Sequence, residues 1–292
     1  MSPKISVIIP NLHCPIIDQT LEALHCQNYD SSQTEILVVG LDNYGLVKED
    51  GLVHMISTGE PVNPARARNI GFEHASGDTI IFLDADCIPA RDWLCSLVST
   101  SEHIEQLGAA SGAMKMISYP FWTLCDQLST FYEYLAIHKA GFRRTLASFS
   151  LLVPRSVIAQ VGGFNENFTT AEDLDWTIRI AKAGYHLYFT PEALVTHHPA
   201  RSTLHDLCQH AFISGTNSIW VRLQHAEWYN TPGWAKLPWS WRLLSPAIAL
   251  VKTIQILKHS ALWRCLYTAP WIFLSKIEWC WGAAHSLSKS LI

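Results

Sequence analysis

The chain has 292 residues and a mass of 32.8 kDa, which suits one large domain with appended elements or two modest domains. Hydrophobic residues make up 49% and charged residues 16%, and this composition excludes a disordered chain. The net charge of −4 is uneven, because residues from 236 onward carry +6 and the first 235 carry −10; an acidic body of this kind argues against binding to nucleic acid.

The first third of the sequence alternates short apolar runs with helical patterns. Strands are predicted at 5–9, 35–39, 53–56 and 79–83, and helices at 16–26, 64–75 and 90–104. Pro64 suits the first turn of a helix, with Asn63 before it as the cap. This order predicts an α/β fold with a mostly parallel sheet flanked by helices, in which ligands bind beyond the carboxyl ends of the strands.

The middle of the chain is less regular. Aromatic helical character at 119–138 is followed by a predicted strand at 147–153 and a short helix at 155–161. A helix at 172–183 should end at Gly184, a natural residue for the position after a helix. Two short strands are then predicted, at 186–189 and 194–197.

The N-terminus and the cysteines bear on the cellular compartment. The first strand begins after a single Lys and no long apolar run, so we expect neither a signal peptide nor an anchor. The eight cysteines form no CxxC pair, and we expect free thiols in a reducing compartment. The body of the protein is therefore expected in the cytoplasm.

The sequence after residue 200 is rich in tryptophan and in basic residues. Nine of the twelve tryptophans lie there, and its uncharged runs, such as 265–275, are shorter than the ~18 residues of a spanning helix. Around residue 250, one helical side holds Lys252, Gln255 and His259, and another holds Ala247, Leu250, Ile254 and Leu257. This amphipathic pattern predicts peripheral membrane contact through 236–292. Packing on the catalytic domain or on a second subunit is the alternative.

A pair of carboxylates follows the strand at 79–83. Asp84 and Asp86 come directly after its last residue, at the edge of the sheet where ligands bind. Oxygen ligands in that place suit Mg²⁺ or Mn²⁺, which would also bind the oxygens of a diphosphate. A solvated acidic turn or a helix cap would show the same pattern, so the neighbouring motifs are needed to distinguish a metal site from these alternatives.

Those neighbours, taken in order, resemble family 2 glycosyltransferases of the GT-A fold. The resemblance covers roughly residues 4–215. It rests on Ile5-Ser6-Val7-Ile8-Ile9-Pro10, Asn63-Pro64-Ala65-Arg66-Ala67-Arg68-Asn69-Ile70-Gly71, Ala75-Ser76-Gly77-Asp78, Phe82-Leu83-Asp84-Ala85-Asp86, Gly162-Gly163-Phe164-Asn165-Glu166, Glu172-Asp173-Leu174-Asp175-Trp176, Pro191-Glu192-Ala193 and His197. It implies a catalytic domain at 1–200, with a nucleotide-sugar half at 1–110 and an acceptor half at 111–200, and a helical extension at 201–292.

The resemblance assigns a metal and donor site. Asp86 is expected to bind the metal directly, and Asp84 to contact the ribose or a water on the metal. His197 is expected to complete the metal shell, because it shares strand parity with Val195, although His198 beside it offers a second imidazole. An imidazole suits Mn²⁺ better than Mg²⁺. Pro10, at the end of the first strand, is expected in the donor site.

The same resemblance makes Asp173 the candidate base. A carboxylate is needed to take the proton of an acceptor hydroxyl, and the helix N-terminus is expected to keep Asp173 ionised. Glu172 is expected to hold the acceptor or to lie close behind the site. Asp175 and Arg179 are four residues apart on this helix and are expected to pair with each other.

Three arginines are candidates for contact with the diphosphate. Arg66 and Arg68 open one helix but point in different directions, so we expect only one of them to face the donor, and Arg201 is a further candidate. Many relatives carry acidic residues directly after the second strand, where one contacts the nucleobase. Here Gly40 intervenes, and Asp42 is the candidate from a shifted position.

The expected activity is inverting transfer of one sugar from a nucleotide-sugar, with UDP as the default nucleotide, to a hydroxyl acceptor. The acceptor is expected to be a glycan or a lipid-linked glycan at the inner face of the cell membrane, and the enzyme is a possible homo-oligomer. The Gln-x-x-Arg-Trp motif of processive synthases does not occur, which favours a single addition. One alternative is a metal-dependent nucleotidyltransferase. Enzymes of that class generally carry a Gly-rich, basic loop after the first strand, and residues 11–14 contain no Gly, Lys or Arg. The other alternative is a catalytically silent scaffold that binds nucleotide-sugar.

Overall fold

A computed structural model describes residues 5–289 of the chain, which divide into two compact units. The first unit comprises Met1–Lys115 and Tyr134–His198, and the second comprises Met116–Glu133 and Pro199–Ile292. The segment 116–133 thus belongs with the C-terminal helices. The domain boundaries expected from the sequence, 1–200 and 201–292, stay a prediction.

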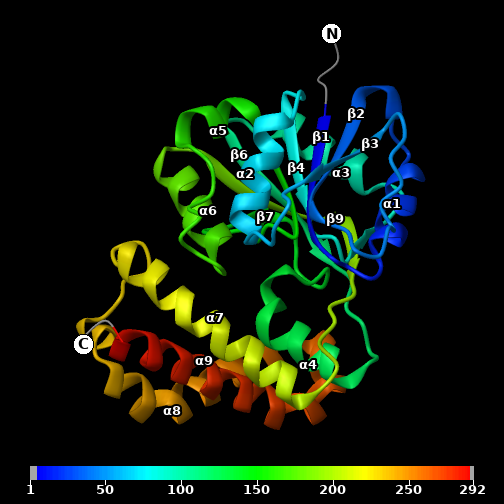
Figure 1. The fold of residues 1–292 in the computed structure, drawn as a ribbon. Coiled ribbons are helices and arrows are strands. Elements are labelled where there is room, and N and C mark those ends of the chain that lie inside the picture. Colours follow the sequence, from blue (N-terminus) through cyan, green and yellow to red (C-terminus); the bar gives the residue numbers. More distant parts are fainter. Residues whose placement is uncertain (1–4, 290–292) are drawn as a thin grey trace. The chain divides into compact units, whose positions relative to one another are not determined.

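A nine-stranded mixed sheet forms the centre of the first unit (Figure 1). The strand order is β3-β2-β1-β4-β8-β6-β9-β5, with β7 paired to β9. The pairs among β1, β2, β3 and β4 are parallel, as is β6 with β9, whereas β8, β5 and β7 pair in antiparallel fashion. The strands are β1 (Ile5–Leu12), β2 (Thr34–Leu41), β3 (Val53–Ser57), β4 (Thr79–Leu83), β5 (Cys87–Pro89), β6 (Leu107–Met114), β7 (Gly141–Phe142), β8 (Ser150–Pro154) and β9 (His186–His197).

Helices lie on both faces of this sheet, with α2 in front of it and α3 behind it in Figure 1. They are α1 (Ile17–His25), α2 (Pro64–His74), α3 (Trp93–His103), α5 (Arg155–Val161) and α6 (Glu172–Lys182), with 3-10 turns η1 (Ser31–Gln33) and η2 (Tyr132–Tyr134). Residues 5–9 of β1 and 80–83 of β4 are buried on both faces, as expected of central strands in a covered sheet. The α/β fold expected from the sequence is confirmed.

Two sheet predictions needed correction. The strands expected at 186–189 and 194–197 are one strand, β9, which continues through Pro191; the pairing of β9 with β6 shifts register there, since proline cannot donate to a ladder. The sequence also gave no sign of β6, whose small residues have low β-propensity. Gly108 and Gly112 of β6 have no room for a side chain, because a Cβ would overlap Ile180 or the Ala193 carbonyl.

The second unit is helical. It contains α4 (Phe121–Thr130), α7 (Leu204–Gln224), η3 (Gly233–Lys236), α8 (Pro238–Leu257), η4 (Ser260–Thr268) and α9 (Ala269–Lys289). The helix α9 packs on α7 and on α8, and the closest approach is to α7. There a Cβ on Gly215 would overlap the carbonyl of Trp279, and a Cβ on Gly282 that of Phe212.

The helix expected at 119–138 is shorter than predicted. It ends at Thr130, because the chain returns to the sheet unit, where Leu135 forms a bridge with Met114. All eight cysteines are free, as expected. Among residues 5–289, no helix has the length and apolar character that crossing a bilayer requires.

Candidate active site

Arg68 lies at the centre of a buried charge cluster in the first unit. Asn63 caps α2 by accepting from the backbone N–H of Arg66, and small residues of the helix, including Gly71, pack directly on the sheet. The side chain of Arg68 is therefore only 4% exposed. Its Nη1 donates to Oε1 of Glu172 at 2.6 Å and its Nη2 to Oδ1 of Asp84 at 2.8 Å. One guanidinium thus joins the end of β4 to the start of α6.

Backbone and side-chain contacts fix the loop Asp84-Ala85-Asp86. The N–H of Asp84 donates to the carbonyl of Phe149, and the hydroxyl of Thr20 donates to the carbonyl of Ala85 at 2.8 Å. The strand β5 then pairs with the end of β9, with Cys87 opposite His197. This pairing places Nε2 of His197 3.4 Å from Oδ2 of Asp86.

Three side chains at this loop could hold a metal ion. One ligand atom each of Asp86, Cys87 and His197 lies within 4.8 Å of the others. His197 and Val195 are both buried on one side of β9, as their shared parity predicts, and His198 is exposed, so His197 is the histidine that lies beside Asp86. A carboxylate and an imidazole together fit Mn²⁺ better than Mg²⁺. Asp84 is not in this group, since its Oδ1 accepts from Arg68.

Asp173 is half-buried beside the cluster, at the first turn of α6. Its Oδ2 accepts from the backbone N–H of Ser148 at 3.1 Å and its Oδ1 from that of Leu174 at 2.8 Å. Burial, and then repulsion from Glu172, raise the pKa of Asp173 to about 7, although Arg68 and these hydrogen bonds act in the opposite direction. The expectation that the helix N-terminus keeps this carboxyl ionised does not allow for its burial, which raises the pKa above its ordinary value despite the N–H of Leu174. A carboxyl with this pKa can accept a proton near neutral pH.

Other predicted site residues have structural partners. Arg179 pairs with Asp175 at 2.9 Å, as expected, and its two terminal nitrogens donate to the carbonyls of Val161 and Gly163. This arginine therefore holds the Gly162-Gly163 turn. Arg66 is exposed and contacts Glu166 at 3.2 Å.

Arg201 belongs to the second unit. Its Nε donates to Oδ2 of Asp126, whose Oδ1 contacts Nδ1 of His210 at 2.6 Å. Hydrogen bonds and charge from these two partners lower the pKa of Asp126 to about 2 despite its burial. The contact of Arg201 with a donor phosphate stays a prediction.

The ends of β1 and β2 form the remaining part of the site. Pro10 stands opposite Val39, and Gly40 has φ +135° and no room for a Cβ beside the carbonyl of Asn11. Asp42 follows; its Oδ2 accepts from the N–H of Val47 at 2.7 Å. Its Oδ1 is buried and has no hydrogen-bond partner within the part of the chain that the structure describes. An unpaired buried oxygen of this kind suits an N–H donor of a ligand.

Sequence reasoning missed Ser148, Thr20 and Cys87. Ser148 and Thr20 act through contacts distant in sequence, which no local pattern reveals. Cys87 directly follows the carboxylate motif, and this adjacency was the available signal.

Comparison with known proteins gives consistent family matches. A family model described as "Glycosyl transferase family 2" matches residues 6–118, and one described as "Glycosyl transferase family group 2" matches residues 79–275. Glycosyltransferase AglE of Haloferax volcanii is 32% identical over 211 residues, which cover 68% of each chain. The N-acetylglucosaminyl-diphospho-decaprenol L-rhamnosyltransferase of Mycobacterium tuberculosis is 32% identical over 123 residues, which cover 41% of this chain and 40% of that protein.

Solved structures share the fold. Mannosyltransferase PcManGT from Pyrobaculum calidifontis, determined in complex with GDP-Man and Mn²⁺, superposes with a TM-score of 0.62 over 96% of this chain and 88% of its own, at 18% sequence identity. At that identity the likeness concerns the fold, which is of the GT-A type with a C-terminal helical extension.

Proposed function

Because this chain belongs to glycosyl transferase family 2, we propose that it moves one sugar from a nucleotide-sugar to a hydroxyl acceptor, with inversion at the anomeric carbon. The observation that carries the proposal is the position of Arg68. Its guanidinium joins Asp84, in the carboxylate motif, to Glu172, the neighbour of Asp173. The candidate metal loop and the candidate base thus belong to one connected cluster.

Asp173 is the proposed base. Near neutral pH a group with a pKa of about 7 is partly ionised and still basic enough to take the hydroxyl proton as the acceptor oxygen attacks the anomeric carbon. Ser148 orients the carboxylate through its backbone N–H, and Glu172 stays paired with Arg68. The bond to the diphosphate breaks on the opposite side of the sugar, which gives inversion.

A divalent cation fits the oxygen and nitrogen ligands at the carboxylate loop. We assign Asp86 and His197 as its ligands and Mn²⁺ as the preferred ion, with Mg²⁺ as the alternative; Asp84 supports the site through the ribose or a bound water. When bound, the cation would neutralise charge on the departing diphosphate. The Mn²⁺ and GDP-Man of PcManGT support this assignment by analogy.

The donor contacts follow from what each side chain already binds. Arg68 already forms ion pairs with two carboxylates. Arg66 is exposed and forms a surface ion pair with Glu166, so it is the arginine of α2 proposed to contact the diphosphate. Pro10 and Asp42 are proposed to contact the nucleoside. Because only Oδ1 of Asp42 lacks a partner, it suits the single imide N–H of uracil better than the two adjacent N–H groups of guanine, which favours a UDP-sugar.

The proposed acceptor is a glycan, carried by a lipid or growing, at the inner face of the cell membrane. The rhamnosyltransferase relative is named for a lipid-diphosphate sugar, and this name supports an acceptor of that class. Asp175 and Arg179 hold α6 in place and act on the acceptor only through that helix. Arg201 is proposed for a phosphate of donor or acceptor.

The test is turnover of a panel of UDP- and GDP-sugars by the purified chain, scored by release of nucleoside diphosphate with water or added glycan as acceptor. Wild type should release UDP when Mn²⁺ is present and stop in chelator. Asp173→Asn should lower the rate by about 10²–10⁴-fold, whereas Glu73→Gln, a neutralised acid on α2 outside the site, should not. Undiminished turnover by Asp173→Asn would remove the base assignment.

The same assay separates the alternatives. A nucleotidyltransferase would consume a nucleoside triphosphate with a sugar phosphate and release pyrophosphate. A silent scaffold would show a thermal shift with nucleotide-sugar and no turnover with any donor.

A further inference from the structure

We propose that α8, with η3 and η4 on either side of it, is a docking face for the surface of an anionic lipid bilayer. The face is defined by Leu237, Trp239, Leu243, Leu250, Val251, Ile254, Trp263, Leu266 and Tyr267. It is called the α8 face below. Its binding to lipid does not depend on the transfer reaction.

Large apolar side chains are concentrated on this part of the molecule. Among residues 5–289, sixteen large hydrophobic residues are exposed, and eleven of them lie between 234 and 281. Scattered exposed apolar residues are common on soluble proteins, but a contiguous set marks an interaction site. Apart from Leu237, the residues of the α8 face come from two elements, α8 and η4, which are adjacent in the chain and pack on each other.

The periodicity of α8 explains the face. Trp239, Leu243, Leu250 and Ile254 are separated by four, seven and four residues, so they form one stripe along the helix. They are 60%, 69%, 54% and 57% exposed. The side of α8 that packs on α9 also contains apolar residues, since Trp241, Ala249, Ile256 and Leu257 are buried beside Ser240, Ser245 and Thr253. The helix α8 thus has apolar residues on its buried side and a second, exposed apolar stripe that the core does not use.

The 3-10 helix η4 continues the pattern with aromatic side chains. Leu262, Cys265 and Thr268 are buried, whereas Trp263 and Leu266, one 3-10 turn apart, are 64% and 56% exposed. Tyr267 is exposed to the same degree as Leu266. Tryptophan and tyrosine favour the boundary between lipid headgroups and acyl chains.

The charge of this segment selects the partner. Residues 228–277 contain no Asp or Glu and six Lys or Arg. Five of these cations are exposed, and all lie in the segment that carries the α8 face: Lys236, Arg242, Lys252, Lys258 and Arg264. A second copy of the chain would bring the same positive charge against itself, whereas an anionic bilayer complements it.

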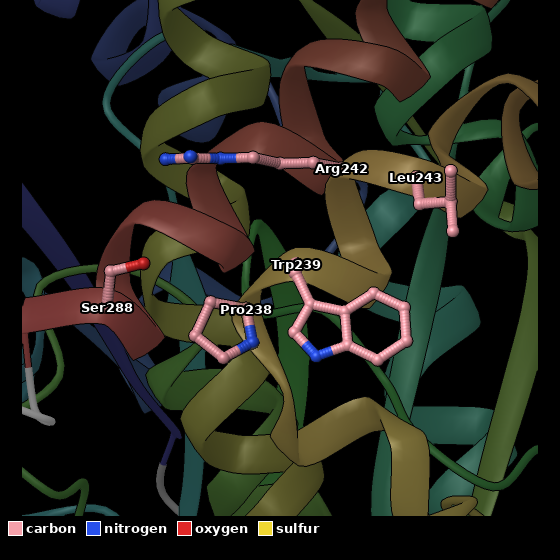
Figure 2. A pocket seen from close by; sticks show the side chains of 5 residues that line it. All are labelled: Pro238, Trp239, Arg242, Leu243 and Ser288. Atoms are coloured by element: carbon pink, nitrogen blue, oxygen red, sulfur yellow. The ribbon is translucent and has the colours of Figure 1, made fainter.

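A pocket at the start of α8 has both a cation and apolar side chains in its lining. It is lined by Pro238, Trp239, Arg242 and Leu243 of α8 and by Ser288 of α9 (Figure 2). In Figure 2 the side chain of Arg242 extends away from Leu243, so the cation and the apolar residue lie on different sides of the helix. A lipid would place its phosphate near the guanidinium and its chains near Trp239 and Leu243.

The experiment is vesicle flotation of the full chain with phosphatidylcholine alone and with phosphatidylcholine mixed with phosphatidylglycerol. Wild type should float with the mixed vesicles, and high salt should reduce the bound fraction. The double variant Lys252→Ser/Lys258→Ser should bind about 25-fold more weakly, from about fivefold for each charge near an anionic surface. The matched control is Arg91→Ser/Lys139→Ser, which removes two exposed cations of the first unit and should bind like wild type.

An apolar variant tests the stripe itself. Leu243→Ser/Ile254→Ser should lose vesicle binding, and Phe142→Ser, at an equally exposed apolar residue of β7, should retain it. Donor hydrolysis should be unchanged in all of these variants, so loss of lipid binding and loss of transfer activity are separate outcomes. Wild type that stays unbound, controls that lose as much, or a dimer that Leu243→Ser/Ile254→Ser dissociates would overturn the proposal; the last result would make the α8 face a subunit contact.

Discussion

Replacing Arg68 by Met should destabilise the first unit far more than the same change at Arg66, two residues earlier on α2. Arg68 is 4% exposed and bridges Asp84 and Glu172, so Met leaves two carboxylates at the cluster without their cation. Breaking a buried ion pair in this way costs about 3–5 kcal/mol. Arg66 is 45% exposed and has one surface partner, Glu166, for which the loss is about 0–1 kcal/mol.

Urea unfolding of the two variants and wild type measures the difference. At about 2–4 °C per kcal/mol for a unit of this size, the Arg68→Met midpoint should also fall by roughly 6–20 °C on heating. The deficit depends on pH. Arg68 lowers the pKa of Asp173, so without it the pKa of that carboxyl in the folded state rises further above its ordinary value. A carboxyl whose pKa is raised in the folded state destabilises that state at pH values above its ordinary pKa. This destabilisation disappears as the pH falls, so the loss of stability in Arg68→Met relative to wild type should become smaller toward about pH 5.

Two results would refute this reasoning. One is an equal loss in Arg68→Met and Arg66→Met, which would mean that the buried bridge contributes no more than a surface pair. The other is a deficit that stays constant from about pH 8 to about pH 5, which would mean that uncompensated negative charge is not the cause.

Three further predictions concern other parts of the molecule. Gly215→Ala should lower the stability of the helical unit by about 1–3 kcal/mol or more through overpacking, because its Cβ would overlap the backbone of α9. Gly233 has open space around it, so Gly233→Ala should leave the stability unchanged; urea unfolding measures both. Ser148→Ala removes a hydroxyl 3.5 Å from Asp173, so the acidic limb of the pH–rate profile should stay within a few tenths of a pH unit of wild type; a shift of a full unit would show that the hydroxyl, rather than the backbone N–H at 3.1 Å, sets that pKa. His197→Gln should weaken Mn²⁺ binding by about 10–100-fold, measured by paramagnetic resonance of free Mn²⁺; unchanged affinity would remove His197 from the metal site.

Several elements of the first unit followed from local signals in the sequence. The strand Thr79–Leu83 and the helix Arg155–Val161 begin and end where the pattern predicts. The helix Pro64–His74 has the predicted cap, Asn63, and Gly184 has the positive φ expected after α6. These features depend on a few neighbouring residues, which is why periodicity and capping find them.

The missed elements depend on distant contacts. Between Leu107 and Met114 the strand β6 contains only Gly, Ala and Ser. Ile180 and Tyr185 leave no space for a side chain at Gly108, and a local pattern cannot show such a contact. The continuity of β9 through Pro191 depends on its partner β6. A sequence pattern reflects the conformation that a segment prefers in isolation, whereas the conformations of β6 and β9 depend on contacts with neighbouring elements.

The structure brings together some of the predicted site residues, whose roles stay predictions. Asp86 and His197 lie 3.4 Å apart at the carboxylate loop. The sequence did not reveal that Arg68 is buried between two acids, or that burial raises the pKa of Asp173. Desolvation depends on all the residues that surround a group, whereas a helix N-terminus can be recognised from a few residues of the sequence.

The helical unit is assembled from two stretches of chain, and this affects the order in which the protein can fold during synthesis. The helix α4 is made before β8 and β9, but its partners in α7 and α9 follow much later; the Lys276 ammonium donates to the Ser129 carbonyl across 147 residues. Until the ribosome has produced that partner, the buried side of α4, including Leu124, Cys125 and Leu128, has nothing from its own unit to cover it. A nascent chain halted near residue 200 would therefore present this side of α4 to chaperones, even with all nine strands of the sheet already synthesised.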